Sequence, residues 1–215
     1  MFQIIDDLVP KGFADALENM CKTEIPWQME STISGFKGEQ SKNLKVEGAN
    51  FDGMQFGFYH WAMNGQYESP FFHRILPLMY FLEQKTGEPI KEIHRIRLAL
   101  TTSVGKEVQH FPHVDAYYPH KVLLYYVNDS DGDTFMMNEM YDEEQLGTGG
   151  FTDIKRLELD ESTDKNGKKA LTDFTVKQRV TPQKGRAIVF DGYNYHNSSK
   201  PVNHEARYIV NIDFI

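Results

Sequence analysis

The sequence predicts an α+β protein that is mainly β, a β-sandwich or jelly roll flanked by N-terminal helices, and three observations support this prediction. Short segments with the two-residue alternation of strands fill the chain after Pro89. Turn sequences such as Asp131-Gly132 and Asn166-Gly167 separate these segments. Stripes of apolar residues at helical spacing come earlier, before the strand-rich part.

Residues 1–92 are expected to form a support for the β core. Residues 2–5 predict a short strand, and residues 9–22 predict a helix with Pro10 at its entry. Residues 24–69 combine frequent glycines with many aromatics, which leaves two interpretations open: irregular strands packed on a core, or a loop that grips a ligand. Residues 70–85 predict a second helix, ended by Gly87 and Pro89.

Residues 93–215 are expected to form the core of a single domain that spans residues 1–215. The segment 93–103 alternates residues of unlike character on its two faces, as a strand does. Further strands are predicted at 121–128, 134–138, 174–181, 186–191 and 206–215. The glycines and the Lys-Asn-Gly-Lys-Lys run of residues 141–169 predict an insertion, either a hairpin or a mobile lid.

Composition limits the kinds of protein that this chain can be. Of its 215 residues, 40% are hydrophobic, 13% aromatic and 25% charged, as expected for a packed globule and not for a disordered chain. With 23 Lys and Arg against 31 Asp and Glu, the net charge is −8, so we expect no nucleic-acid partner. The longest apolar run, Val122–Val127, has six residues, too few for a membrane helix.

The cysteine content and the first residues indicate a location. Cys21 is the single cysteine and cannot form an internal disulfide, which fits a reducing compartment. Residues 1–7 mix apolar and acidic groups and lack the basic start of a signal peptide. We therefore expect a cytoplasmic protein without a membrane partner.

The last predicted strand has two unlike faces. Its apolar face consists of Tyr208, Val210, Ile212 and Phe214, and its other face of Arg207, Ile209, Asn211 and Asp213. Charged and amide groups on one strand face are costly to bury without partners, so this face should line a polar cavity. For Arg97, on the alternating strand 93–103, two interpretations stay open: it points into this cavity, or it forms an ion pair elsewhere.

One His-x-Asp sequence, His113-Val114-Asp115, is the first candidate for a metal site. About one such pair is expected by chance from eight histidines and 31 acidic residues, so only its context gives it meaning. In an extended backbone, residues i and i+2 project to the same face, so both side chains can reach one ion. His196 supplies a third candidate ligand. Two histidines and one carboxylate, with open positions, are the ligand set of non-haem Fe(II) oxygenases.

Arg207 follows His196 by eleven positions, at the start of the last predicted strand. A guanidinium is planar and takes a carboxylate in two parallel hydrogen bonds. Arg207 is therefore suited to one end of a dicarboxylate whose other end chelates a metal ion.

In their order and spacing, these pieces resemble the Fe(II)- and 2-oxoglutarate-dependent dioxygenases, in particular the prolyl 4-hydroxylase-like branch. The resemblance covers about residues 93–215 and, less specifically, the opening strand and helix. The matching pieces are His113-Val114-Asp115, the strand 122–128, the turn Asp131-Gly132-Asp133-Thr134-Phe135, residues 182–190, His196 and residues 206–211.

The resemblance implies a role for each matched residue. It implies that His113, Asp115 and His196 bind iron, and that the fold is a double-stranded β-helix. It also implies that Arg207 binds the distal carboxylate of 2-oxoglutarate and that Tyr126 donates its hydroxyl to the same carboxylate. Core packing by Tyr126 is an equally supported alternative, because both faces of the strand 121–128 are apolar or aromatic.

The resemblance further implies an enzyme that hydroxylates a small molecule or a peptide, with peptidyl proline as the first candidate. Such an enzyme uses O₂ and 2-oxoglutarate, releases succinate and CO₂, and is expected to need ascorbate as reductant. Asp115 stands where related halogenases have a small residue, so hydroxylation is favoured. The acidic composition disfavours an AlkB-like nucleic-acid demethylase. The alternative from another class is a non-catalytic, cupin-like metal-binding jelly-roll protein, which has no need of Arg207.

The other histidines are not assigned to the metal. His110 and His120 flank the motif and are expected to be surface residues or supporting neighbours of the site. His60, His73, His94 and His204 lack partners at ligand spacing and are expected to be structural.

Overall fold

The computed structural model describes residues 1–33, 45–51, 55–141 and 173–215. Its helices are α1 (Lys11–Thr23), α2 (Phe72–Ile75) and α3 (Pro77–Thr86). Its strands are β1 (Phe2–Ile5), β2 (Gln28–Glu30), β3 (Lys45–Val46), β4 (Gly57–Asn64), β5 (Tyr67–Glu68), β6 (Ile93–Thr102), β7 (Lys121–Tyr126), β8 (Thr134–Met140), β9 (Asp173–Phe174), β10 (Val176–Val180), β11 (Ala187–Asp191), β12 (Asn194–Ser198) and β13 (Ala206–Phe214). The predicted insertion at 141–169 lies outside the described residues except for Tyr141.

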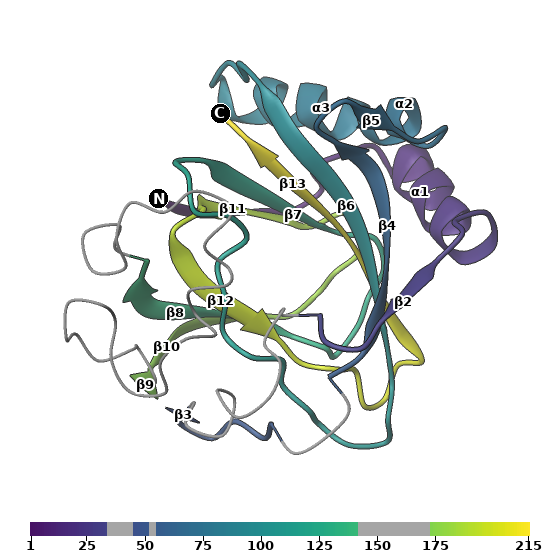
Figure 1. Ribbon diagram of the computed structural model, residues 1–215. Coiled ribbons are helices and arrows are strands. Elements are labelled where there is room, and N and C mark those ends of the chain that lie inside the picture. Colours follow the sequence, from purple (N-terminus) through teal and green to yellow (C-terminus); the bar gives the residue numbers. More distant parts are fainter. Residues whose placement is uncertain (34–44, 52–54, 142–172) are drawn as a thin grey trace.

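Two antiparallel sheets make up most of the fold (Figure 1). The larger has the order β1-β11-β7-β13-β6-β4-β2, with β5 paired to β4, and the smaller has the order β10-β8-β12. The strands β3 and β9 form a separate parallel pair. The prediction of a mainly β protein with N-terminal helices is confirmed.

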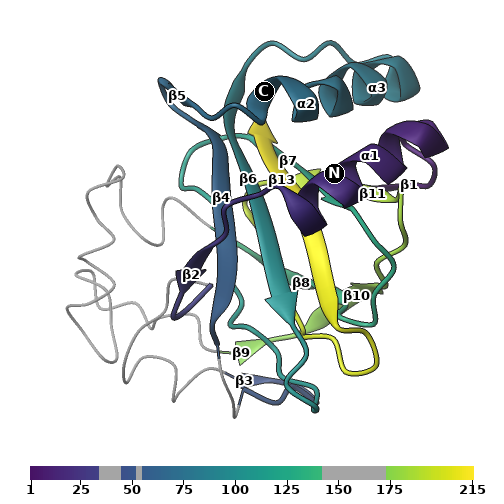
Figure 2. The same cartoon turned by 90° about the vertical axis from the view of Figure 1, so that its right-hand side faces the viewer.

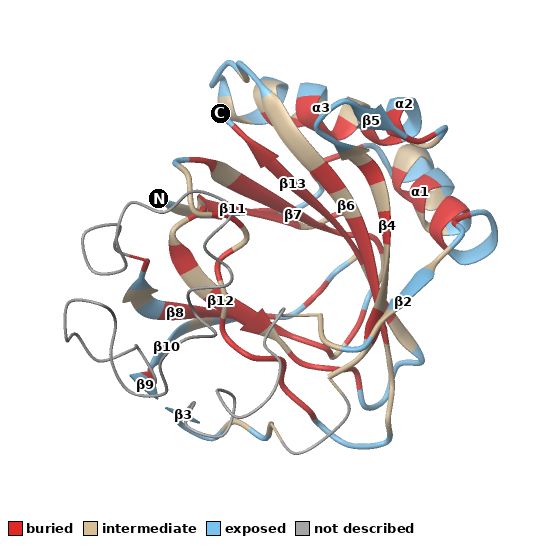
Figure 3. Ribbon diagram, in the orientation of Figure 1, coloured by how far each residue is buried: buried red, intermediate tan, exposed pale blue. Residues whose placement is uncertain are grey.

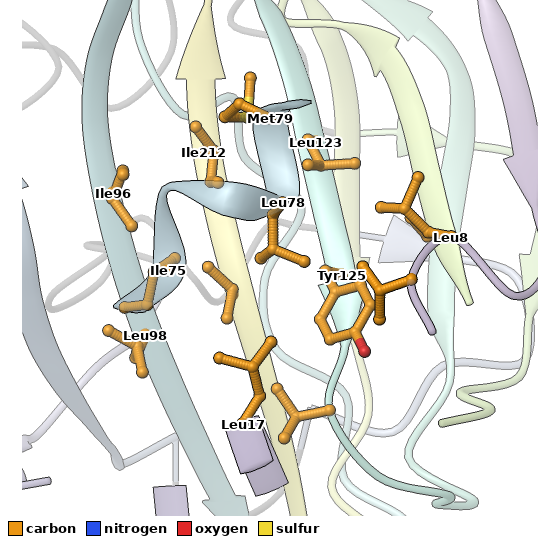
Figure 4. Close-up of a cluster of buried hydrophobic side chains, with 14 of the residues drawn as sticks. Leu8, Leu17, Ile75, Leu78, Met79, Ile96, Leu98, Leu123, Tyr125 and Ile212 are labelled. Atoms are coloured by element: carbon orange, nitrogen blue, oxygen red, sulfur yellow. The ribbon is translucent and has the colours of Figure 1, made fainter. Parts of the chain in front are cut away.

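The three helices cover one face of the larger sheet, as two perpendicular views show (Figures 1 and 2). The buried side chains that join them are drawn in Figure 4: Leu17, Ile75, Leu78 and Met79 from the helices, and Ile96, Leu98, Leu123, Tyr125 and Ile212 from the strands. Burial of this apolar surface is the main contribution to stability on this side of the sheet. Within the described ranges, none of these helices combines the length and the apolarity that a membrane crossing requires.

The opposite face of the larger sheet turns toward the smaller sheet. A second apolar cluster joins the two sheets: Ala99, Val122, Leu124, Tyr126, Ile188, Phe190 and Ile209 from the larger, with Met136 and Val180 from the smaller. Strands of both sheets are buried along much of their length (Figure 3). Arg207, Asn211 and Asp213 lie on this inner face and are 3%, 2% and 0% exposed. The prediction that one face of this strand is polar and buried is therefore confirmed.

The predicted helix at 70–85 is in fact two helices. Proline has no backbone N–H and cannot continue the hydrogen-bond ladder of a preceding helix, but it is well placed in a first helical turn. Accordingly α2 ends at Ile75 and α3 begins at Pro77. Gly87 follows α3 in the left-handed conformation, with a φ of 71°, and so ends the helix as predicted.

Five strands, β2, β3, β4, β5 and β12, were not predicted individually. β4 lies within the aromatic segment 24–69, between β6 and β2, so for residues 57–64 the strand interpretation is correct. β12 is composed of Asn-Tyr-His-Asn-Ser, which has no apolar alternation. Its strand conformation comes from pairing with β8 and not from local sequence preference.

The turn before β13 is held by one carboxylate, that of Asp131. It accepts hydrogen bonds from the backbone N–H groups of Val202, Asn203 and His204 at 3.1, 2.8 and 3.3 Å. Although partial burial works in the opposite direction, these donors hold the pKa of the Asp131 carboxyl well below its ordinary value.

We expect Asp131→Ala to lower the free energy of unfolding by about 1–3 kcal/mol at pH 7, because hydrogen bonds to a charged acceptor are lost. A carboxyl with a depressed pKa stabilises the fold above its unfolded-state pKa, and this contribution is lost as the pH falls through the folded-state pKa. The difference between wild type and variant should therefore shrink in acid, below a pH of about 4. Urea unfolding at pH 7 and in acid measures it. A difference that grows on acidification would contradict this assignment.

Candidate metal centre

The structure brings His113, Asp115 and His196 together between the two sheets. Each offers one ligand atom, and these atoms all lie within 4.8 Å of one another. His196 Nε2 lies 3.4 Å from Asp115 Oδ2, and the two imidazole rings have centroids 4.7 Å apart. Three donors of this kind on one side of an ion leave the other side open to further ligands.

Backbone pairing places the two histidines opposite each other. The N–H of His113 donates to the carbonyl of His196 at 2.9 Å, and the N–H of His196 donates to the carbonyl of His113 at 3.0 Å. Further along, the N–H of His110 donates to the carbonyl of Ser198 at 2.8 Å. Residues 109–113 therefore run antiparallel to β12 and extend the smaller sheet on that side.

The hydrogen bonds of the imidazole rings select the tautomer that can bind a metal. Nδ1 of His113 lies 3.0 Å from the carbonyl of Phe111, and Nδ1 of His196 lies 3.1 Å from the carbonyl of Asn194. A carbonyl can only accept, so each Nδ1 carries the proton and each Nε2 keeps its lone pair. Burial, together with the neighbouring His196, lowers the pKa of His113 to about 4, so this ring is neutral at neutral pH.

The carboxylate of Asp115 is oriented by two neighbours on the larger sheet. Its Oδ1 lies 2.8 Å from Nη2 of Arg95, and its Oδ2 accepts a hydrogen bond from Nδ2 of Asn211 at 3.0 Å. Arg95 also forms an ion pair with Asp213 through Nε. Although burial raises it, the charge of Arg95 holds the pKa of Asp115 well below its ordinary value. The site thus presents two imidazole Nε2 atoms and one ionised carboxylate, a donor set that fits a divalent transition metal.

We expect Arg95→Gln to weaken Fe(II) binding by about 10- to 100-fold, the usual effect of removing a group that orients a metal ligand. Arg95→Lys should lose less, because it keeps the charge near both carboxylates but not the planar fork. Titration of the metal-free protein with Fe(II) measures the affinity. Arg74→Gln, which removes an exposed ion pair with Glu24, is the control. Wild-type affinity in Arg95→Gln would show that the pair does not orient Asp115.

Arg207 forms a second polar centre on the same inner face. Its Nη2 donates to Thr134 Oγ1 at 2.8 Å, and the Tyr126 hydroxyl donates to the same oxygen at 2.9 Å. Burial raises the pKa of Tyr126 to about 12, so the phenol keeps its proton. Arg207 Nε is buried without a hydrogen-bond partner, and no carboxylate among the described residues forms an ion pair with this guanidinium. A buried cation without an anion is costly, which points to an anionic ligand.

Gly132 makes room for this arginine. A Cβ at residue 132 would lie 2.8 Å from the carbonyl oxygen of Ser199 and 3.1 Å from Cδ of Arg207. The turn Asp131-Gly132-Asp133-Thr134 therefore contributes to the surroundings of Arg207 in two ways. Gly132 leaves space for the arginine side chain, and Thr134 supplies the hydroxyl that accepts its hydrogen bond.

The remaining sequence predictions have mixed outcomes. His110 and His120 are not surface residues, since they are 1% and 7% exposed. His120 lies with Nε2 4.0 Å from Asp213, as a neighbour of the network around Arg95. Arg95 and Thr134 had no role predicted from the sequence. For Arg95 the only signal in the sequence was the alternation of residues 93–103, and Thr134 was noted only as part of the matching turn 131–135.

No protein-family model matches this chain, and no curated protein sequence matches it. Solved structures match over almost the whole chain. The non-heme alpha ketoglutarate dependent carbocyclase SnoK of nogalamycin biosynthesis matches with a TM-score of 0.59 at 8% identity, covering 99% of this chain and 78% of that chain.

Two further matches are informative. The alpha ketoglutarate dependent epimerase SnoN has a TM-score of 0.56 at 12% identity over 100% of this chain and 78% of its own, and SnoN is also known in complex with Fe³⁺ and alpha ketoglutarate. A prolyl hydroxylase from Trichoplax adhaerens, bound to a peptide fragment of hypoxia inducible factor, has a TM-score of 0.51 at 13% identity over 100% of this chain and 83% of its own.

At such low identities these matches bear on the fold, and they agree with the resemblance of residues 93–215. The fold of this chain is therefore similar to the folds of Fe- and 2-oxoglutarate-dependent oxygenases, a prolyl hydroxylase among them.

Proposed function

We propose that this protein is a non-haem Fe(II)- and 2-oxoglutarate-dependent oxygenase that hydroxylates its substrate and releases succinate and CO₂. The observation that carries the proposal is the pairing of two centres on one buried face. One is the His113, Asp115 and His196 cluster, and the other is the guanidinium of Arg207, which has no carboxylate partner among the described residues.

The spacing of the two centres suits the cosubstrate. Asn211, which contacts Asp115, and Arg207 lie four residues apart on the same face of β13. At about 3.3 Å per residue their Cα atoms are about 13 Å apart, a span that an arginine side chain and a five-carbon dicarboxylate fill together. In this proposal Arg207 and the Tyr126 hydroxyl hold the distal carboxylate, and the metal ligands face the other end.

In this proposal the chain's own residues bind the metal and the cosubstrate, orient the metal ligands and exclude water. His113, Asp115 and His196 hold the iron, and Arg95 and Asn211 fix the direction of Asp115. The apolar side chains between the sheets, Leu124 and Ile209 among them, keep the space around Arg207 dry and strengthen its attraction for a carboxylate. When bound, Fe(II) and 2-oxoglutarate supply the activation of O₂ that no side chain can provide.

We propose that the mainly β architecture that supports this function is a double-stranded β-helix. The strands β6, β13, β7 and β11 are neighbours in the larger sheet, and β10, β8 and β12 in the smaller one. In this proposal residues 109–113, which form two isolated bridges to the β12 region, take the place of a fourth strand beside the smaller sheet. The metal ligands then lie in the space between the two layers.

The leading candidate substrate is peptidyl proline, with free amino acids and other small metabolites as competitors. The test is turnover of 2-oxoglutarate by the purified protein with Fe(II) and ascorbate, with proline-rich peptides compared with free amino acids. Succinate formed in amounts that match a hydroxylated product supports the proposal. A protein that binds Fe(II) but forms no succinate with any of these compounds would instead favour the cupin-like alternative.

A further inference from the structure

Two arginines on one strand face meet different surroundings. Arg95 and Arg97 are two residues apart on β6, so both project toward the inner face. Arg95 is neutralised by two carboxylates, Asp115 and Asp213. Arg97 forms no ion pair with any carboxylate in the described part of the chain, and Asp115, Asp213 and Glu30 act on it only through space. The sequence left open whether Arg97 points into a cavity or forms an ion pair, and the described residues provide no ion pair for it.

Arg97 lies beside the metal cluster. Its neighbour across the strand pair is Asn211, the residue that donates to Asp115. Arg97 Nε and Asn211 Oδ1 are both buried and have no hydrogen-bond partner among the described residues. A donor and an acceptor left unpaired in adjacent positions indicate that a polar ligand belongs against them.

Aromatic side chains border the same position. Trp61 faces Arg97 across the β4–β6 pair, and the guanidinium carbon lies 5.9 Å from the centre of the Trp61 ring. Tyr59, two residues earlier on β4, makes an edge contact with Trp61 at 6.0 Å between ring centres. Arg97, Trp61 and Tyr59 are each partly exposed, so a ligand can reach them.

The charge of Arg97 makes an anion the fitting ligand. Burial, aided by the like charge of Arg95, lowers the pKa of the Arg97 guanidinium, yet an arginine stays protonated in proteins. Asp115, Asp213 and Glu30 offset part of its cost of desolvation through space, and a negative group bound directly to the guanidinium offsets more. A planar guanidinium prefers a carboxylate, which it can bind through two parallel hydrogen bonds.

We propose that Arg97 is a substrate-binding residue that holds a carboxylate of the substrate, with Trp61 and Tyr59 against the adjoining apolar part. This inference rests on the proposed function and narrows its substrate class. Arg207 cannot serve the same purpose, because in that proposal it is occupied by 2-oxoglutarate. The carboxylate belongs either to a free amino or imino acid or to an acidic side chain of a peptide, and the two sources can be told apart experimentally.

The test compares carboxylates with their amides. Protein loaded with Fe(II) and saturating 2-oxoglutarate, under anaerobic conditions, is titrated calorimetrically with N-acetyl-L-proline and with N-acetyl-L-prolinamide. A second pair consists of two proline peptides that differ by Glu or Gln beside the proline. Saturating 2-oxoglutarate prevents the probes from binding at Arg207.

We expect the wild type to prefer the carboxylate member of at least one pair by about tenfold or more, which corresponds to about 1.4 kcal/mol. Arg97→Gln should remove this preference, and Arg97→Lys should keep part of it. Arg74→Gln, the same change in an exposed arginine paired with Glu24, is the matched control and should keep the full preference. Preference in the first pair indicates a small acid, and preference only in the second indicates a peptide.

Equal binding of both members in both pairs, or no binding of either, would overturn the proposal. So would a carboxylate preference that survives in Arg97→Gln. Succinate formation by the wild type is measured in parallel. A carboxylate preference that depends on Arg97, without any succinate, would mean that the proposed function is wrong and the anion site is real. Succinate formation without the preference would mean that the proposed function is right and the anion site at Arg97 is wrong.

Discussion

Replacing His196 with alanine is expected to lower Fe(II) affinity by more than about 100-fold and to abolish succinate formation, because a centre with three protein ligands loses its geometry when one is removed. His113→Ala should do the same. Both variants should stay folded, since the contacts that place residues 113 and 196 opposite each other are backbone hydrogen bonds, which alanine keeps. Iron titration and succinate assays, with circular dichroism for the fold, measure these effects.

The control for the histidine variants is His73→Ala, at an exposed position of α2. It should bind iron and form succinate as the wild type does. Full turnover in either His113→Ala or His196→Ala would rule out the assignment of that residue as a ligand. If His196→Ala loses iron and also unfolds, iron binding is measured in His196→Gln instead. This variant keeps a polar side chain of similar reach in the same buried space.

Replacing Arg207 with alanine is expected to weaken 2-oxoglutarate binding by about 2–5 kcal/mol, the cost of leaving a desolvated carboxylate without its charged partner. At about 1.4 kcal/mol per tenfold change, this is a loss of roughly 30-fold to several thousand-fold in affinity. Calorimetric titration of the Fe(II)-loaded protein with 2-oxoglutarate gives the affinity directly, and the Michaelis constant should rise in parallel.

Iron affinity separates this effect from a general collapse of the site. Arg207 contacts Thr134 and the Tyr126 ring and none of the three candidate ligands, so Arg207→Ala should bind Fe(II) like the wild type. Arg74→Gln, at an exposed arginine paired with Glu24, serves as the control. Unchanged 2-oxoglutarate affinity in Arg207→Ala would sink the assignment, and so would a loss of iron as large as that of His196→Ala.

The alternation of residue types along single segments was enough for much of the fold prediction. The alternation of residues 93–103 and 206–215 was enough to predict two long strands, observed as β6 and β13. It also divided residues 206–215 into an apolar face, now under the helices, and a polar face, now between the sheets. The spacing of His113 and Asp115 put both side chains on one face for the same reason, because a strand repeats every two residues.

The features that could not be predicted depend on pairing between segments that are distant in the sequence. β12 has no apolar alternation, and it is a strand because β8 and residues 109–113 supply its hydrogen bonds. That pairing brings His196 to His113 across 83 positions of sequence. No property of either segment alone specifies it, since a slip of one residue in register would turn each side chain to the opposite face.

The two arginines of β6 show most clearly what could not be predicted from the sequence. Arg95 and Arg97 are the same residue type on the same strand face, and no local pattern tells them apart. Arg95 is opposite Asp213 in the β6–β13 register and reaches Asp115, whereas Arg97 is opposite the neutral Asn211. The sequence by itself determined that both face one way. Only the register of β13 decided which of the two is neutralised inside the chain and which remains for a ligand, because the energy of a buried charge depends on what the fold places beside it.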